Sequence, residues 1–167
     1  MSDRSDLAKD VGGRAEGPLH YTACGLDDVY LLDGYAIADT PYGRGVTIRN
    51  LDGLHDAIAA NIVLRHQPIA ARELRFLRKQ MEMTQEEFAA ALGVSAQSVA
   101  RYEKGQTEIP GPVDRLARVL HALHRGPAGG REHLVEDILA RRRRDDADRP
   151  DATFRSVGDE WRAARAA

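Results

Sequence analysis

Residues 83–105 read MTQEEFAAALGVSAQSVARYEKG, and this stretch has the signals of two short helices joined by a tight turn. Thr84 is a favourable N-cap, and Glu87 three residues later completes a Thr-x-x-Glu capping box. Gly93 follows apolar residues at i, i+3, i+4 spacing, where a left-handed residue ends a helix at low cost. Ser95 is the N-cap of the second helix. The pattern predicts a helix-turn-helix.

The predicted second helix separates an apolar face from a polar one. Val99 and Tyr102 are expected to point inward, and Gln97, Ser98 and Arg101 outward. In a helix-turn-helix, the N-terminal residues of the second helix meet base edges in the major groove. Gln97 can pair with adenine through two hydrogen bonds, Arg101 can pair with guanine N7 and O6, and Ser98 can reach a base or a phosphate.

Further polar residues are candidates for phosphate contact: Thr84, Ser95 and Lys104. Glu103 would repel phosphates, so we expect it to point away from DNA or to hold Arg101. The alternative is that Arg101 and Lys104 form an ordinary solvated helix face. The capped helix pair favours DNA contact over that alternative.

The same stretch resembles a known family. Residues 84–89, 92–95 and 102–105 are similar to the Xre/Cro-type DNA-binding domain. The resemblance implies that Gln85 matches a position that usually anchors a backbone phosphate. Residues 24–35, 75–79 and 109–112 resemble the MqsA/YgiT-like group, which joins a small N-terminal domain to an Xre-type domain and includes many antitoxins.

Members of that group typically bind zinc in the N-terminal domain through two Cys-x-x-Cys pairs. Cys24 is the only cysteine of this chain, and structural zinc needs four ligands. We therefore expect a metal-free domain and no cofactor. His121, His124 and His133 could approach one another, but no cysteine or acidic partner strengthens a metal site there.

Composition and charge agree with a small regulator. The 167 residues suffice for one or two compact domains, and 43% are hydrophobic. No apolar run has transmembrane length, the first residues form no signal segment, and one cysteine favours the cytoplasm, with nucleoid association on DNA. Residues 68–125 contain nine Arg and Lys against seven Asp and Glu, whereas residues 1–67 contain six against ten. Nonspecific DNA affinity should be weak and salt-sensitive.

The expected fold is mainly α, with an Xre/Cro-like helix-turn-helix domain of about five helices after a small α+β domain. The expected parts are a disordered N-terminus (1–18), an α+β domain (19–66), the helix-turn-helix domain (67–125), and a C-terminal helix with a flexible charged tail (126–167).

Within 19–66, strands 28–32 and 35–38 are expected to pair around an Asp33-Gly34 turn, and a second turn at 41–45 precedes a strand at 46–48. Asn50 or Asp52 is expected to cap a helix with a stripe formed by Leu54, Ile58, Ile62 and Val63.

Further helices are expected at 70–81 and 133–144 and after the Pro110-Gly111-Pro112 break. The helix at 70–81 should bury Leu74, Leu77 and Met81. The helix after the break should bury Val113, Leu116, Val119, Leu120 and Leu123. Residues 145–167 are expected to be a mobile tail from which Phe154 and Trp161 could dock.

These patterns favour a sequence-specific transcriptional regulator, most simply a repressor that binds an operator in double-stranded DNA as a homodimer. Two copies about 34 Å apart meet successive major grooves, and residues 112–140 are the expected dimer surface. An antitoxin that binds a toxin through residues 19–66 and represses its own operon is the alternative. A scaffold that binds only protein is a third possibility. No nucleophile elbow, phosphate loop or His-Glu-x-x-His motif suggests an enzyme.

Overall fold

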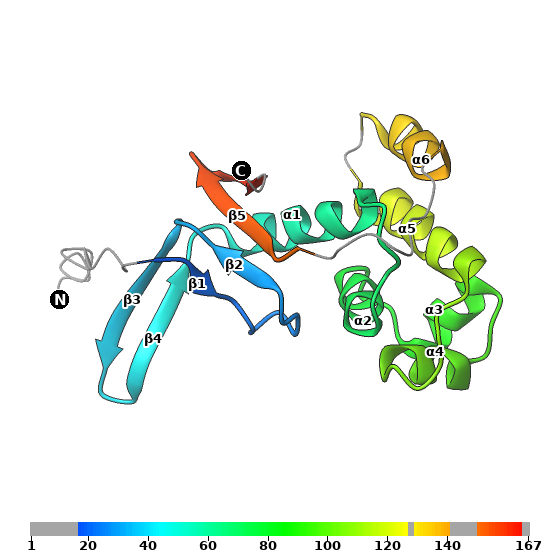
Figure 1. The fold of residues 1–167 in the computed structure, drawn as a ribbon, viewed down its shortest axis with the longest axis horizontal. Coiled ribbons are helices and arrows are strands. Elements are labelled where there is room, and N and C mark those ends of the chain that lie inside the picture. Colours follow the sequence, from blue (N-terminus) through cyan, green and yellow to red (C-terminus); the bar gives the residue numbers. More distant parts are fainter. Residues whose placement is uncertain (1–16, 127–128, 141–149, 165–167) are drawn as a thin grey trace, which may run out of the picture.

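The computed structural model describes residues 17–126, 129–140 and 150–164, in which six helices and six strands form two packed parts. Figure 1 shows the strands at one end of the molecule, the other helices at the opposite end, and α1 (Leu51–Leu64) reaching from one to the other. The described helices and strands are consistent with a helical domain joined to a small α+β part, but the strand content exceeds the mainly α expectation. No helix within these ranges has the length and apolar character needed to span a bilayer.

The strands form two sheets. A four-stranded sheet has the order β1-β2-β5-β6, in which β2 and β5 are parallel and the other neighbours antiparallel. Its members are β1 (Leu19–His20), β2 (Val29–Leu31), β5 (Ala152–Val157) and β6 (Glu160–Ala164). A separate hairpin pairs β3 (Tyr35–Thr40) with β4 (Gly43–Ile48). The second expected turn, within 41–45, is therefore confirmed as the turn of this hairpin.

The expected hairpin around Asp33-Gly34 is wrong, because β2 pairs with β1 and β5 and not with β3. Asp33 Oδ1 instead accepts a hydrogen bond from the Ser156 backbone N–H at 2.5 Å. Gly34 has a φ of 75°, and a Cβ there would lie 2.6 Å from Cη2 of the Trp161 ring. The Asp-Gly pair thus anchors the C-terminal strands, and only glycine fits the second position.

The expectation of a mobile tail is wrong for residues 152–164, which form β5 and β6; residues 145–149 and 165–167 lie outside the described ranges. Phe154 is fully buried, and Trp161 is buried with Nε1 donating to the Arg49 carbonyl at 2.8 Å. Residues 17–64 and 150–164 together therefore form one unit, here called the front domain. The remaining helices are inserted between its two segments.

α1 forms as the sequence predicts and joins the two parts. Asn50 is its N-cap and accepts a hydrogen bond from the Gly53 N–H at 3.1 Å. The expected apolar stripe is buried: Leu54, Ile58, Ile62 and Val63. One end of α1 packs on β5 and β6, and the helix also contacts three helices of the inserted part, α2 (Ala71–Gln80), α5 (Gly111–Arg125) and α6 (Arg131–Ala140).

The inserted helices, here called the helical domain, also follow the expected order. α2, α3 (Gln85–Leu92), α4 (Ala96–Glu103) and α5 surround a core to which Leu74, Leu77, Met81, Phe88 and Val99 contribute. α6 (Arg131–Ala140) then packs on α5. Two details of the expectation are wrong: Leu116 and Leu123 on α5 are exposed. Residues 141–144, the expected end of the last helix, lie outside the described ranges.

A buried arginine ties the helical domain to the end of α1. Arg118 Nε donates to Asp114 Oδ1 at 2.6 Å, and its two terminal nitrogens donate to four main-chain carbonyls. Those carbonyls belong to Ile62, Val63, Arg65 and Gln67, at 2.6–3.0 Å. The other Asp114 oxygen accepts from the Ile69 N–H at 2.7 Å. Because carbonyls at a helix end lack partners within the helix, this arrangement, here called the Arg118 clamp, caps α1 and fixes its exit.

His121 is a second buried side chain that can become a cation, and its burial makes the stability of the fold depend on pH. His121 is 6% exposed, its Nε2 has no hydrogen-bond partner in the described structure, and burial lowers its pKa to about 4, with Arg125 acting in the same direction and Asp56 against it. In the unfolded state His121 takes up a proton near pH 6.5, whereas in the folded state it does so only near pH 4. The stability that the neutral form contributes is therefore full above pH 6.5 and is lost as the pH falls towards 4. We expect the free energy of unfolding to drop by about 2 kcal/mol between pH 7.5 and pH 5 from this group.

Urea unfolding at the two pH values measures this loss. The His121→Leu variant should lose that share of the pH dependence, whereas His124→Gln, which changes an exposed neighbour, should retain it. Equal pH dependence in wild type and His121→Leu would contradict the assignment.

Candidate nucleic-acid interface

The caps of α3 are formed as the sequence predicts. Thr84 Oγ1 accepts from the Glu87 N–H at 3.1 Å, and Glu87 Oε2 accepts from the Thr84 N–H at 2.8 Å. These hydrogen bonds to Thr84 lower the pKa of the Glu87 carboxyl. Gly93 ends the helix in the left-handed conformation, with a φ of 70°. The predicted capping box and glycine C-cap are both confirmed.

α4 begins at a serine cap and has one buried and one exposed face. Ser95 Oγ accepts from the Ser98 N–H at 3.1 Å and lies 2.9 Å from Ser98 Oγ. Val99 and Tyr102 are buried. Gln97 and Arg101 are exposed, four residues apart on the outer face, as expected, whereas Ser98 is half-buried. The orientation of α4 is thus the predicted one, and contact of these residues with DNA remains a prediction.

Glu103 points into the helical domain, where Arg78 and not Arg101 is its partner. It is buried and accepts from Arg78 through both oxygens, at 2.6 Å from Nε and 2.9 Å from the terminal nitrogen. Arg78 also donates to the Met83 carbonyl at 2.8 Å, and its pKa is raised chiefly by the hydrogen bond to Glu103. Of the two expectations, the one that Glu103 holds Arg101 is wrong, because Arg78 takes both carboxylate oxygens, whereas the one that Glu103 points away from the outer face of α4 is confirmed. A paired carboxylate inside the protein presents little repulsion to a phosphate.

The same carboxylate holds Gln85. Gln85 Nε2 donates to Glu103 Oε2 at 2.9 Å, so one buried group connects α2, the start of α3 and the end of α4. This network holds the end of α4 against α2 and α3. It also keeps the Gln85 amide at the first turn of α3. The pairing of Arg78 with Glu103 was not predicted from the sequence, because the two residues lie 25 positions apart and no local pattern relates them.

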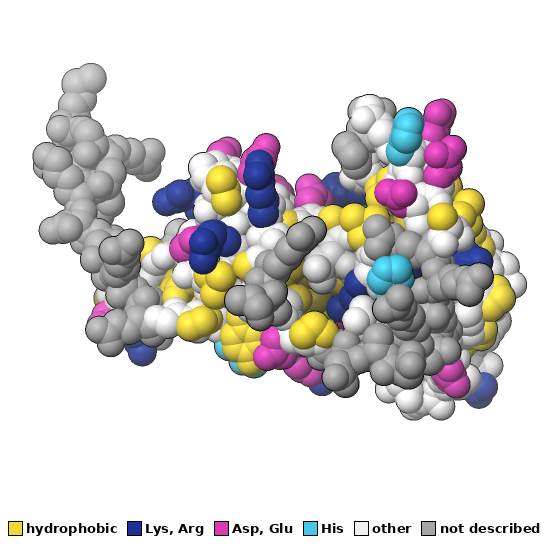
Figure 2. All heavy atoms as spheres, turned by 45° about the horizontal axis from the view of Figure 1, so that its top comes forward, with side chains coloured by type: hydrophobic (Ala, Val, Ile, Leu, Met, Phe, Trp, Pro, Cys, Tyr) yellow, Lys and Arg dark blue, Asp and Glu magenta, His cyan; other side chains and the backbone are white. Residues whose placement is uncertain are grey.

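The outer face of α4 keeps its polar side chains available. Among the described residues, none forms a hydrogen bond or ion pair with the side chains of Gln97, Arg101 or Lys104, and Lys104 is exposed at the C-cap. The hydroxyl oxygens of Thr84 and Ser95 accept hydrogen bonds from the backbone at the helix N-termini. These residues can therefore contribute to phosphate binding mainly by donating their hydroxyl protons. α6 does not extend this face: Figure 2 shows acidic side chains gathered over it, and Glu132, Glu136 and Asp137 are exposed there.

The exposed polar face on a rigid, capped second helix is the geometry of a nucleic-acid reader. Residues 74–123 match the family model described as Helix-turn-helix. The match runs from α2 into α5 and includes both helices of the capped pair. It confirms the helix-turn-helix part of the resemblance to Xre-type domains and indicates a DNA-binding regulatory domain. The front domain lies outside the match. No curated protein and no solved structure matches the chain.

Proposed function

We propose that the protein is a sequence-specific transcriptional regulator that represses genes by placing α4 in the major groove of an operator. The observation that best supports this role is the exposure of Gln97 and Arg101 on one face of a helix held by the Arg78-Glu103 pair. The protein then acts by binding and not by catalysis.

In this proposal the side chains divide into two kinds of contact. Gln97, in the first turn of α4, reads adenine, and Arg101, one turn later, reads guanine, each with about 1–3 kcal/mol of discrimination. Ser98 reaches a base or a phosphate. The other candidates, which hold the helix against the DNA backbone without reading sequence, are Gln85, Thr84, Ser95 and Lys104.

A homodimer is part of the proposal, since one recognition helix reads few base pairs and paired half-sites restore selectivity. Leu123 supports it: this side chain is 51% exposed on α5, within the expected surface of residues 112–140. Sedimentation of the protein on its operator measures the copy number, and a single copy per operator would remove this part of the proposal.

The Arg101→Ala variant is expected to lose DNA affinity about 10- to 100-fold, because a bidentate base contact is worth about 1–3 kcal/mol. Selection from a random duplex pool first provides the preferred sequence, and fluorescence anisotropy then measures both proteins on it. Gln97→Ala should lose a similar amount of DNA affinity, and it should reduce the sequence preference at a different base pair. Circular dichroism should be unchanged, since both side chains are exposed.

Arg162→Ala is the matched control, because it removes an exposed arginine of β6 in the front domain. It should bind as wild type does. A wild-type protein that enriches no sequence at low salt, or an Arg101→Ala variant that binds with unchanged affinity, would refute the proposed function.

An antitoxin role is a second proposal, and the β3-β4 hairpin favours it. Figure 1 shows this hairpin projecting from the front domain. Tyr42 at its tip is fully exposed and Val46 is 48% exposed, within the residues 19–66 expected to meet a toxin. A reading frame for a small toxin beside the gene, whose product binds the wild type but not a Tyr42→Asp variant, would support this role. The absence of such a reading frame would rule against the antitoxin role and leave the regulator role as the one proposal.

A further inference from the structure

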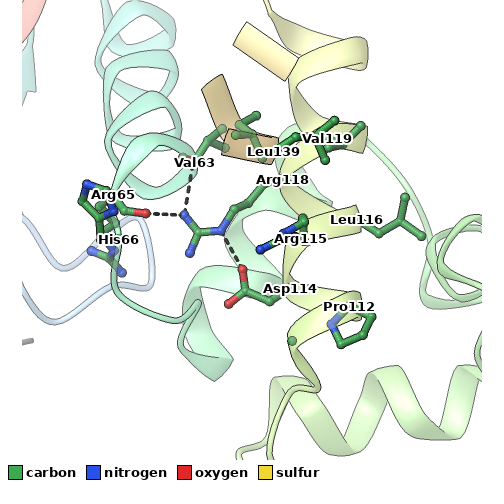
Figure 3. Close-up of a pocket in the computed structure, with 12 residues that line it drawn as sticks. Val63, Arg65, His66, Pro112, Asp114, Arg115, Leu116, Arg118, Val119 and Leu139 are labelled. Carbon is green, nitrogen blue, oxygen red and sulfur yellow. Dashed lines mark hydrogen bonds and ion pairs between the residues drawn. The ribbon is translucent and has the colours of Figure 1, made fainter. Parts of the chain in front are cut away.

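A pocket of about 640 Å³ lies where the end of α1, the first half of α5 and α6 meet (Figure 3). This volume falls within the range of small-molecule sites, about 300–1,000 Å³. Its walls are largely apolar, and the side chains that form them are Val63, Leu116, Val119, Ile138 and Leu139. Such walls suit an organic body and not a hydrated ion.

The charged groups of the pocket leave an excess of positive charge. Asp114 is the one acidic residue among the described residues that line it, and both of its oxygens are engaged, one by Arg118 and one by the Ile69 N–H. Arg115 also lines the pocket and is exposed, and no carboxylate of the described ranges forms an ion pair with it. His66 lies at the same pocket. An anion is therefore attracted by Arg115 and meets no unpaired acid among the lining residues that the structure describes.

We propose that this pocket binds a small organic anion, with an aromatic or aliphatic body against the apolar walls and its acidic group paired with Arg115. A planar guanidinium suits such a group because it donates two parallel hydrogen bonds to one acid. The site lies apart from the outer face of α4 and does not depend on DNA binding. Its occupant touches Asp114 and Arg118, the clamp at the junction of the two domains.

Anilinonaphthalene sulfonate is a suitable probe for the full chain, because it joins an aromatic body to one acidic group and fluoresces when apolar surroundings enclose it. N-phenylnaphthylamine is its neutral counterpart. The expected result is saturable binding of the sulfonate at one site per chain, about tenfold tighter than binding of the neutral amine. A stoichiometry well above one, or equal affinity for the two probes, would overturn the proposal.

Variants then test whether this pocket is the site. Arg115→Met should weaken the sulfonate about tenfold and leave the neutral amine unchanged. Arg75→Met is the matched control, because it removes an exposed arginine of α2 that does not line the pocket. Leu139→Asp puts an acid on a half-exposed wall position and should weaken both probes while unfolding is unchanged. Equal effects of Arg115→Met and Arg75→Met, or wild-type binding by Leu139→Asp, would refute the assignment.

Discussion

Replacing Arg118 with methionine is expected to lower the free energy of unfolding by about 3–5 kcal/mol, the usual cost of breaking a buried ion pair from one side. The substitution leaves the Asp114 carboxylate buried without its cation, and it removes the donor from four carbonyls at the exit of α1. Each buried acceptor left alone adds to the loss. Against a typical total of about 5–15 kcal/mol, this is a large share. Urea unfolding followed by far-ultraviolet circular dichroism measures it.

The same helix offers a matched control. Arg115→Met changes the same residue type three positions earlier, on the exposed side, and should cost less than about 0.5 kcal/mol. Adding Asp114→Leu to Arg118→Met should recover part of the loss, because it removes the unpaired charge. If Arg118→Met unfolds at the same urea concentration as Arg115→Met, the clamp contributes little to stability.

The Phe154→Ala variant should destabilise the front domain by about 3–5 kcal/mol, the range for truncating a buried phenylalanine. Phe154 is fully buried on β5, opposite Ala163 of β6 and beside Leu31 of β2. The readout is specific, because Trp161 is the only tryptophan of the chain and lies in the same sheet. Its fluorescence reports the front domain while circular dichroism reports chiefly the helices.

Arg155→Ala alters the next residue along the strand, which is exposed, and it should leave the midpoint of the fluorescence transition nearly unchanged. A mobile tail would give the same result for both variants. If Phe154→Ala and Arg155→Ala both unfold at the wild-type midpoint, residues 150–164 are not an integral part of the front domain.

Local signals were enough to predict the helix-turn-helix. Its caps, its C-terminal glycine and the inward side chains Val99 and Tyr102 act within a few residues of one another, so they can be found without knowing the rest of the fold. The stripe of α1 and the hairpin at 41–45 were predictable for the same reason. The positions on α4 that we propose to face DNA follow from that local geometry.

The parts that could not be predicted depend on distant partners. β2 pairs in parallel with β5, more than a hundred residues later, and a local pattern cannot reveal such a pairing. The two-residue turn between β5 and β6 is Gly158-Asp159, a pair that is typical of hairpins. The many charged residues around it led us to expect a mobile tail instead. The buried positions of Glu103 and Arg118 depend on contacts with other helices. Charged residues are usually exposed, so burial of these two required the structure.

The pairing of β2 with β5 orders events during synthesis. The ribosome releases residues 29–31 early, yet their neighbours, residues 152–154, emerge only after every helix of the helical domain has been translated. Contacts among α2, α3, α4 and α5 are all available by then, so this segment can fold while the chain is still growing. Until β5 is made, β2 can pair with β1 but has no partner along its other edge. The nascent chain is therefore open to misassociation along this unpaired edge of β2.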